Sequence, residues 1–330
     1  MRKILPFLFV LTLAILLVGC AVEGTDVDKA TQGPEDGEAK PIEIVHSKGT
    51  TTLEKPAQRV VALEWIYGEN MLAMGVEPVG MTDIEGYYTW MNNGGIKLDD
   101  SVVNLGVRGS ANLEDIAALK PDLIVTADYY EYDYELLSAI APTIVLTPYP
   151  GEQYPSGEYD HMISSIEIMG KALGLEDKAA EVIASLDQAY AKASERLKDT
   201  SIDFNYIELI DFSTADTVSM YLFTDSSIHT SILEKIGFTN MYRPEKFELY
   251  GQTNINVENL VGLDNYSLFI VAEKGEDVFS KGLISENVLN GLKFYTENNM
   301  YYLGTNASPF GPLSTLSFVD IVVEAALANE

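Results

Sequence analysis

Short apolar runs alternate with amphipathic stretches along the first half of this 330-residue chain. The runs at 59–63, 123–127 and 144–146 have the length and apolar character of buried strands. Apolar residues at helical spacing follow the first run, at 68–74, and Gly75 provides a helix end. Strands that alternate with helices in this way predict a mainly parallel sheet with helices on its faces.

Strand-like runs return at 206–210 and 220–223, but the stretch between 158 and 198 has only a helical pattern. Within it, over 176–199, apolar residues recur at steps of three and four and predict one long helix with a single apolar stripe. The stripe consists of Ala179, Val182, Ile183, Leu186, Ala189, Tyr190, Ala193 and Leu197. A helix of this length extends for about 34 Å.

The long helix divides the chain into two α/β lobes. We expect an N-terminal lobe over 41–175, the connecting helix over 176–199 and a C-terminal lobe over 200–330. One stiff helix between two lobes limits hinge motion, and it leaves a cleft between the lobes for a ligand.

One motif occurs once in each lobe. Asn112 and Asn256 each stand at a helix N-cap, Glu114 and Glu258 follow in the first turn, and apolar residues come next at helical spacing. Each copy then passes through polar or proline residues into a short apolar run that indicates a buried strand. The repeat predicts two lobes of similar construction.

The N-terminus has the pattern of a secretion signal. Two basic residues precede an apolar run over 4–18, and Cys20, the single cysteine of the chain, follows. This arrangement resembles the lipobox of bacterial lipoproteins, so we expect a signal peptide over 1–19, lipidation of Cys20 and a flexible polar tether over 20–40. The protein would then be anchored on the extracytoplasmic face of the cell membrane. The alternative is an ordinary signal peptide with an incidental cysteine.

The formal charge of −29 excludes several classes of partner. A strongly acidic surface repels nucleic acid and anionic lipid headgroups, so we expect no nucleic-acid partner. The acidic residues are spread along the chain, and 47% of its residues are apolar, which is typical of a folded globular protein.

Catalytic motifs are missing from the sequence. It has no Gly-x-Ser-x-Gly elbow, no His-Glu-x-x-His and no Gly-rich phosphate loop. The three histidines, His46, His161 and His229, have no paired spacing, so we expect no metal bound directly by the protein and no cofactor. We predict a binding protein; a surface glycosidase that uses a carboxylate pair, or a lipid-anchored adhesin, remains the alternative.

A series of motifs resembles iron–siderophore binding proteins, the substrate-binding components of ABC importers whose lobes are joined by one long helix. The motifs, in order, are Leu63-Glu-Trp65, Leu72-Ala-Met-Gly-Val-Glu-Pro-Val-Gly80, Tyr87-Tyr-Thr-Trp90, Leu105-Gly-Val-Arg108, Leu119-Lys-Pro-Asp-Leu-Ile124, Ser231-Ile-Leu-Glu-Lys-Ile-Gly237 and Tyr250-Gly251. The resemblance covers nearly all of 42–328 and is strongest to the ferrichrome and ferric-hydroxamate binders. It implies a class III periplasmic binding protein that delivers a ferric siderophore to a permease dimer with separate ATPase subunits. We expect it to be a monomer.

The resemblance also assigns ligand-binding residues. It gives Arg108 the role of the ligand-contacting arginine, Tyr130 that of the tyrosine that assists it, and Trp90 and Tyr250 those of aromatic walls of the two lobes. Three further tyrosines, Tyr129, Tyr132 and Tyr134, lie in the same segment, so the sequence leaves open which of the four takes this role. We expect Trp65 to be a packing residue at the end of a strand.

The number of basic residues bears on the class of siderophore. Only four arginines follow the signal peptide: Arg59, Arg108, Arg196 and Arg243. Catecholate and citrate chelates of iron are strongly anionic and need several basic partners, so a neutral or cationic hydroxamate fits better. Arg243, together with Lys246 and His229, could form a second basic cluster, so a carboxylate siderophore remains an alternative ligand. Haem is a further alternative, because tyrosine and histidine can ligate its iron.

Glu114 and Glu258 stand apart from the ligand. The resemblance implies that these two acids, one at the top of each lobe, dock onto arginines of the permease dimer. The alternative is that each only favours its own helix dipole.

Overall fold

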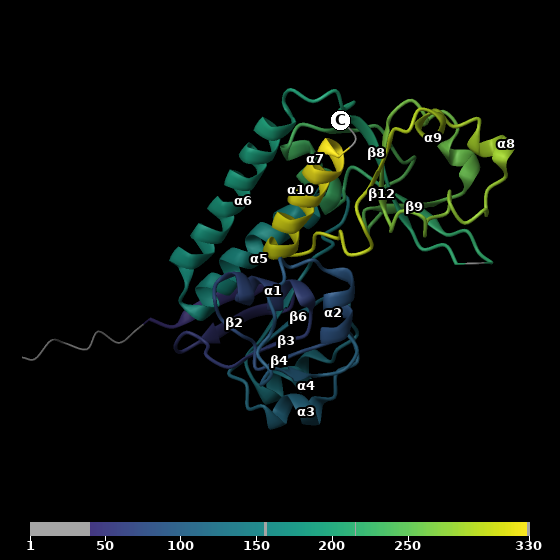
Figure 1. The fold of residues 1–330 in the computed structure, drawn as a ribbon. Helices are drawn as coiled ribbons and strands as arrows, with labels where there is room; N and C mark the ends of the chain where they lie inside the picture. Colours follow the sequence, from purple (N-terminus) through teal and green to yellow (C-terminus); the bar gives the residue numbers. More distant parts are fainter. Residues whose placement is uncertain (1–39, 155–156, 215, 329–330) are drawn as a thin grey trace, which may run out of the picture. The chain divides into compact units, whose positions relative to one another are not determined.

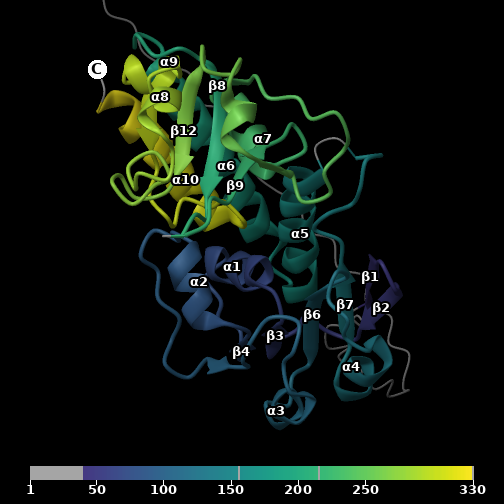
Figure 2. The same ribbon diagram turned by 90° about the vertical axis from the view of Figure 1, so that its right-hand side faces the viewer.

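The computed structural model describes residues 40–154, 157–214 and 216–328 (Figures 1 and 2). The predicted signal peptide, Cys20 and the tether up to position 39 lie outside the described residues. None of the described helices has the length and apolar character that are needed to cross a membrane.

The N-terminal lobe is built on a five-stranded sheet in which every neighbouring pair is parallel. Its order is β5 (Val103–Asn104), β4 (Gly80–Met81), β3 (Val60–Ala62), β6 (Leu123–Ala127) and β7 (Thr143–Leu146). Its helices are α1 (Trp65–Ala73), α2 (Ile84–Trp90), α3 (Leu113–Ala118) and α4 (Tyr134–Ile140). Successive side chains of a strand point to opposite faces, so Val60 and Ala62 pack with α1 while Val61 packs with Ile116 of α3 and Leu137 of α4.

A β-hairpin that the apolar pattern does not predict precedes this sheet. Strands β1 (Ile42–His46) and β2 (Gly49–Leu53) pair antiparallel, with half of their residues exposed. Its position is fixed by Thr51, whose hydroxyl donates to the carbonyl of Thr143 at 2.7 Å.

The C-terminal lobe holds a six-stranded sheet in which three of the five strand pairs are parallel, as predicted, and two are antiparallel. The main path is β11 (Gln252–Ile255), β9 (Met220–Phe223), β8 (Asn205–Asp211), β12 (Ser267–Val271) and β13 (Met300–Tyr302), and β10 (Thr239–Asn240) also pairs with β8. Pairs β8–β12, β12–β13 and β8–β10 are parallel, whereas β9 runs antiparallel to both of its neighbours. The helices of this lobe are α7 (Ile228–Lys235), α8 (Glu286–Leu289), α9 (Lys293–Thr296), α10 (Pro312–Leu327) and the 3₁₀ helix η1 (Val257–Leu260).

The second copy of the repeated motif forms only this short 3₁₀ helix, where the sequence predicts a helix like the first. The two copies align Ala117-Ala118 of α3 with Val261-Gly262. Alanine is the best helix former, whereas a β-branched residue followed by glycine favours chain reversal, and Gly262 has a φ of 92°. The strand that follows, β12, forms as predicted.

The helical stretch between the lobes contains two helices, α5 (Gly157–Leu173) and α6 (Glu176–Leu197). The chain reverses at Gly174, whose φ of 67° suits glycine. Helix α6 packs against α5 and α10, while α5 contacts α1 of the first lobe and α7 of the second (Figure 1). One hydrophobic core therefore continues from the first sheet through these helices to Tyr206 and Phe269 of the second.

Candidate ligand-binding site

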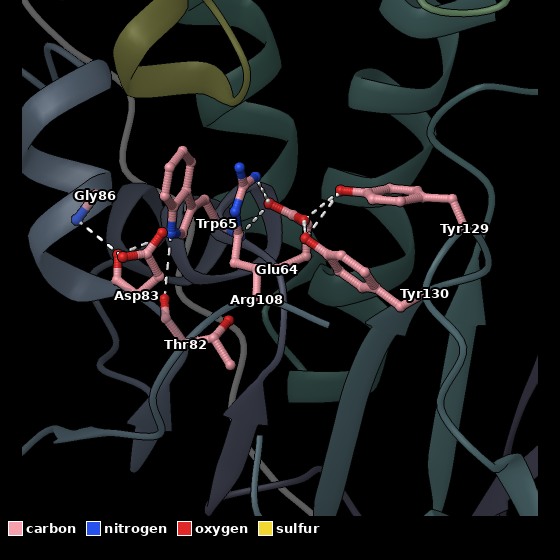
Figure 3. Close-up of polar contacts among 8 residues, drawn as sticks. All are labelled: Glu64, Trp65, Thr82, Asp83, Gly86, Arg108, Tyr129 and Tyr130. Atoms are coloured by element: carbon pink, nitrogen blue, oxygen red, sulfur yellow. Dashed lines mark hydrogen bonds and ion pairs between the residues drawn. The ribbon is translucent and has the colours of Figure 1, made fainter. Parts of the chain in front are cut away.

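A buried carboxyl group organises the polar end of the site. Glu64 lies between β3 and α1, is fully buried, and caps α1 by accepting the backbone N–H of Trp65 at 2.6 Å. Its carboxylate also accepts hydrogen bonds from Nη1 of Arg108 at 3.1 Å and from the hydroxyls of Tyr129 and Tyr130 (Figure 3). Residues from three separate segments therefore converge on one side chain.

The guanidinium of Arg108 is held from a second side by an indole ring. It lies 3.5 Å from the centroid of the Trp65 ring, and the indole N–H donates to the carbonyl of Asp83 at 3.0 Å. Burial opposes the charge of Arg108, but the neighbouring Glu64 outweighs burial and raises the pKa of the guanidinium above its ordinary value. The arginine keeps its charge while 30% of its side chain stays exposed.

The two tyrosines act as donors to Glu64. Burial first, and then the negative charge of Glu64, raise the pKa of the Tyr129 and Tyr130 hydroxyls well above the ordinary value. Both hydroxyls therefore stay protonated, and both are directed to the carboxylate rather than into the open space beyond Arg108.

A cavity of about 320 Å³ opens beside Arg108 and is bounded by both lobes. It is lined by Trp65, Trp90, Met91, Arg108, Tyr149, Glu158, Ile210, Phe212, Phe223, Ser227, Ile228, His229, Tyr250, Gln252, Ser308, Pro309 and Phe310. Two aromatic pairs link the lobes at its edge: Trp90 and Phe212 have ring centroids 6.0 Å apart, and Tyr149 and Tyr250 have centroids 5.0 Å apart. An aromatic wall with a few polar groups is typical of a small-molecule site.

The wall contributed by the C-terminal lobe contains a buried acid–histidine pair. Nδ1 of His229 lies 2.8 Å from Oε1 of Glu208, and the imidazole stacks on Phe223 with centroids 3.8 Å apart. Within the described ranges, no three His, Cys, Asp or Glu side chains gather into a group that could hold a metal ion.

The structure brings together three of the predicted ligand-binding residues. Arg108, Trp90 and Tyr250 line the cavity, whereas Tyr130 lies behind Arg108 and contacts Glu64. Arg243 is outside the cavity lining: it is exposed and donates to the carbonyl of Tyr242 at 2.9 Å.

Sequence reasoning missed several residues of the site. Glu64 belongs to the Leu63-Glu-Trp65 motif, but the three side chains that bond to it are 44 to 66 positions away along the chain. Tyr149 and Glu158 lie outside every motif that the sequence analysis identifies. Trp65, expected to be a packing residue, is 2% exposed but also lines the cavity and supports Arg108.

The two acids predicted to dock on a permease are both exposed. Glu114 lies in the first turn of α3, where the Asn112 side chain accepts its backbone N–H at 2.8 Å, and Glu258 lies in the first turn of η1. In the part of the chain that the structure describes, neither carboxylate forms an ion pair.

The sequence matches the periplasmic binding protein family over residues 60–307, a span that contains β3, Arg108, α5, α6 and all of the second sheet. The chain belongs to this family. Family membership confirms the predicted role of an extracytoplasmic substrate-binding component of an ABC importer, and it confirms that the protein is not an enzyme.

Individual periplasmic binding proteins support the same assignment. The Fe(3+)-citrate-binding protein YfmC of Bacillus subtilis is 30% identical over 280 residues, which is 84% of this chain and 82% of that protein. The iron(3+)-hydroxamate-binding protein FhuD of Escherichia coli is 28% identical over 61% of this chain and 64% of its own length. The structure of FhuD from Vibrio cholerae with bound Fe3+-Desferal has a TM-score of 0.71 at 22% identity and covers 82% of this chain and 98% of that one. This likeness confirms the predicted class III fold of two α/β lobes.

Proposed function

We propose that the cavity beside Arg108 captures a ferric siderophore of the hydroxamate type and delivers it to the permease of an ABC importer. The observation that carries this proposal is the fixed guanidinium at the wall of an aromatic cavity. A siderophore already surrounds its iron with oxygens, so the protein need supply only donors to those oxygens and apolar surface for the scaffold. Arg108 supplies the donors, and Trp90 and Tyr250 supply aromatic surface.

Charge favours the hydroxamate class. Among the described residues that line the cavity, Arg108 is the single arginine or lysine, and its charge is already matched by Glu64. A ferric trihydroxamate core carries no net charge. A trianionic ferric catecholate would enter this cavity with little to balance its charge, at a considerable electrostatic cost in a partly desolvated site.

Ferric citrate is the second candidate, because the Bacillus subtilis relative at 30% identity is named as a citrate binder. The predicted basic cluster around Arg243 would serve such a ligand. Arg243 lies outside the cavity lining, so a citrate complex would have to rely on Arg108 or extend beyond the cavity.

A fluorescence titration tests the proposal. Both tryptophans of the chain, Trp65 and Trp90, line the cavity, so a bound ferric complex should quench the emission. The chain that begins after Cys20 would be titrated with a ferric trihydroxamate, ferric citrate, a ferric catecholate and haem. We expect saturable quenching by the trihydroxamate that Arg108→Ala weakens and Arg196→Ala, which removes only a surface ion pair, leaves unchanged. Preference for citrate, the catecholate or haem would overturn the hydroxamate assignment. Absence of quenching by all four ligands would overturn the proposed capture of a ferric chelate.

Delivery requires the partners implied by the family. We propose that a permease dimer receives the loaded protein, that separate subunits hydrolyse ATP, and that the protein is a monomer tied to the membrane by lipid on Cys20. Cys20→Ser should then release the protein from the membrane fraction. Retention of the variant on membranes would contradict the anchor without affecting the ligand assignment.

A further inference from the structure

The N-terminus of α7 faces the cavity and is already occupied by a carboxyl group of the protein itself. Glu158 lies in the first turn of α5, and its Oε2 accepts the backbone N–H of Ile228, the first residue of α7, at 2.9 Å. Both residues line the cavity. The free N–H groups and dipole of a helix N-terminus attract anions. At the N-terminus of α7, Glu158 already occupies the position that an anionic group of a ligand would take.

The second oxygen of the same carboxyl has no partner. Oε1 of Glu158 is buried and forms no hydrogen bond among the described residues. The backbone of Gly251 packs closely against this oxygen: the residue has a φ of 61°, and a Cβ there would lie 2.8 Å from Oε1. Gly251 follows Tyr250 of the cavity wall. A buried oxygen without a donor is costly, and a donor on the ligand would remove that cost.

Among the described residues, no basic side chain forms an ion pair with Glu158. Among the described residues that line the cavity, the basic side chains are Arg108 and His229. Nδ1 of His229 is directed to Glu208, and Arg108 is paired with Glu64. Burial raises the pKa of Glu158 to about 8, against the opposing effect of the Ile228 hydrogen bond. The position therefore suits a positive group that comes from outside the chain.

We infer that Glu158 selects ligands by charge, pairing with an amino group on the scaffold of the ferric chelate and repelling a carboxylate at the same place. This inference rests on the proposed function, since it describes a second contact within the same cavity. Arg108 would contact the oxygens around the iron, and Glu158 would recognise the periphery of the molecule. Discrimination of this kind comes from an attractive contact for one ligand and a repulsive one for the other.

Three ferric chelates with one iron core test this inference. Ferrioxamine B carries a terminal ammonium, its N-acetyl derivative is neutral there, and its N-succinyl derivative carries a carboxylate. We expect the protein at pH 8.5 to bind the ammonium form at least tenfold more tightly than the carboxylate form, with the acetyl form between them. Glu158→Gln, which keeps an acceptor for Ile228, should bring all three affinities within about twofold. The matched control is Asp160→Asn, an exposed charge change on the same helix, and it should preserve the order.

A second measurement needs no variant. In the unmodified protein, the preference for the ammonium form should grow as the pH rises from 6.5 to 8.5, because Glu158 ionises in that range. Equal binding of the three chelates at both pH values, or tighter binding of the carboxylate form, would overturn the role of Glu158 and leave the hydroxamate assignment standing. Failure to bind any of the three would overturn the hydroxamate assignment, and this inference with it.

Discussion

Arg108 lies over the ring of Trp65, with its guanidinium carbon 3.5 Å from the centroid of the indole ring. Glu64 holds the same guanidinium from the side through Nη1 at 3.1 Å. A stacked and paired arginine has little freedom left to lose when a ligand binds, so less of the interaction energy is spent on ordering it. The arrangement is therefore consistent with the proposed role of Arg108 as the polar anchor of the cavity.

Glu64→Gln should therefore weaken the binding of a ferric trihydroxamate by roughly tenfold or more, since a loss of about 1.4 kcal/mol corresponds to a factor of ten. The amide keeps an acceptor for the tyrosine hydroxyls, but it removes the charge that orients Arg108. The emission spectrum of Trp65 should shift as well, because the cation no longer stays on its ring. Tryptophan fluorescence with and without ligand measures both effects.

Glu43→Gln is the matched control, because it changes an exposed acid on β1 of the same lobe and should alter neither affinity nor spectrum. Unchanged affinity in Glu64→Gln would mean that the indole alone positions Arg108.

The sequence predicts the elements whose pattern is local. Helix α6 follows from its apolar stripe, and strands β3, β6 and β12 follow from continuous apolar runs. The β1–β2 hairpin escapes prediction because its strands are short and half exposed. The direction of β9 escapes prediction for a different reason. Its residues are buried almost throughout, as is typical of a parallel strand, although it runs antiparallel to β8.

The same division applies to the site. Arg108, Trp90 and Tyr250 could be proposed because each lies in a motif of its own, and all three line the cavity. The role of Glu64 depends on contacts between segments that meet only in the folded chain, and no local spacing signals them. Glu158 belongs to no motif, and its hydrogen-bond partner among the described residues, the N–H of Ile228, lies in the other lobe, so its position in the cavity wall could not be predicted.

Tyr250 should contribute to ligand affinity without contributing to stability. The residue is 57% exposed and its ring meets Tyr149 of the other lobe edge-on, so a ligand that enters the cavity would cover it. Tyr250→Ala should weaken ligand binding by about three- to tenfold, in line with the roughly 0.5–1.5 kcal/mol that an aromatic contact contributes. The melting temperature should change little. Calorimetric titration and thermal melts measure the two quantities.

Tyr295→Ala, an exposed tyrosine of α9 outside the cavity, is the control for this change. A large drop in melting temperature for Tyr250→Ala would show instead that the residue mainly joins the two lobes.

Glu69 should make stability depend on pH. Its buried carboxyl in α1 accepts the N–H and the hydroxyl of Ser314 in the first turn of α10, at 2.6 and 2.9 Å. Burial raises its pKa from 4.5 to about 7, and the Ser314 hydrogen bonds oppose that rise. Between pH 4.5 and 7 the unfolded chain releases this proton while the folded protein keeps it, so the contribution of Glu69 to stability falls as the pH rises through this range.

Glu69→Gln removes this titration and keeps an acceptor for Ser314. At pH 8 the variant should be more stable than the parent protein by roughly 1–3 kcal/mol, and the gain should vanish near pH 4. Urea denaturation at a series of pH values gives the difference between the two proteins, which cancels the contributions of Glu158 and other titrating groups. A constant difference at every pH would contradict the assigned titration of Glu69.

Reversal of the charges at Glu114 and Glu258 should separate docking from binding. Both carboxylates are exposed, one in the first turn of α3 and one in that of η1, and neither residue lines the cavity. The double variant Glu114→Lys, Glu258→Lys should keep the affinity for the ferric ligand and lose uptake of labelled iron into cells, because it presents like charges to the arginines expected on the permease.

The control is Glu176→Lys, Glu286→Lys, which reverses two exposed first-turn acids on α6 and α8. If the control pair lost uptake equally, general surface charge rather than docking would be responsible. If the double variant lost ligand affinity, the two acids would belong to ligand binding, and each lobe's repeated motif would need a different explanation.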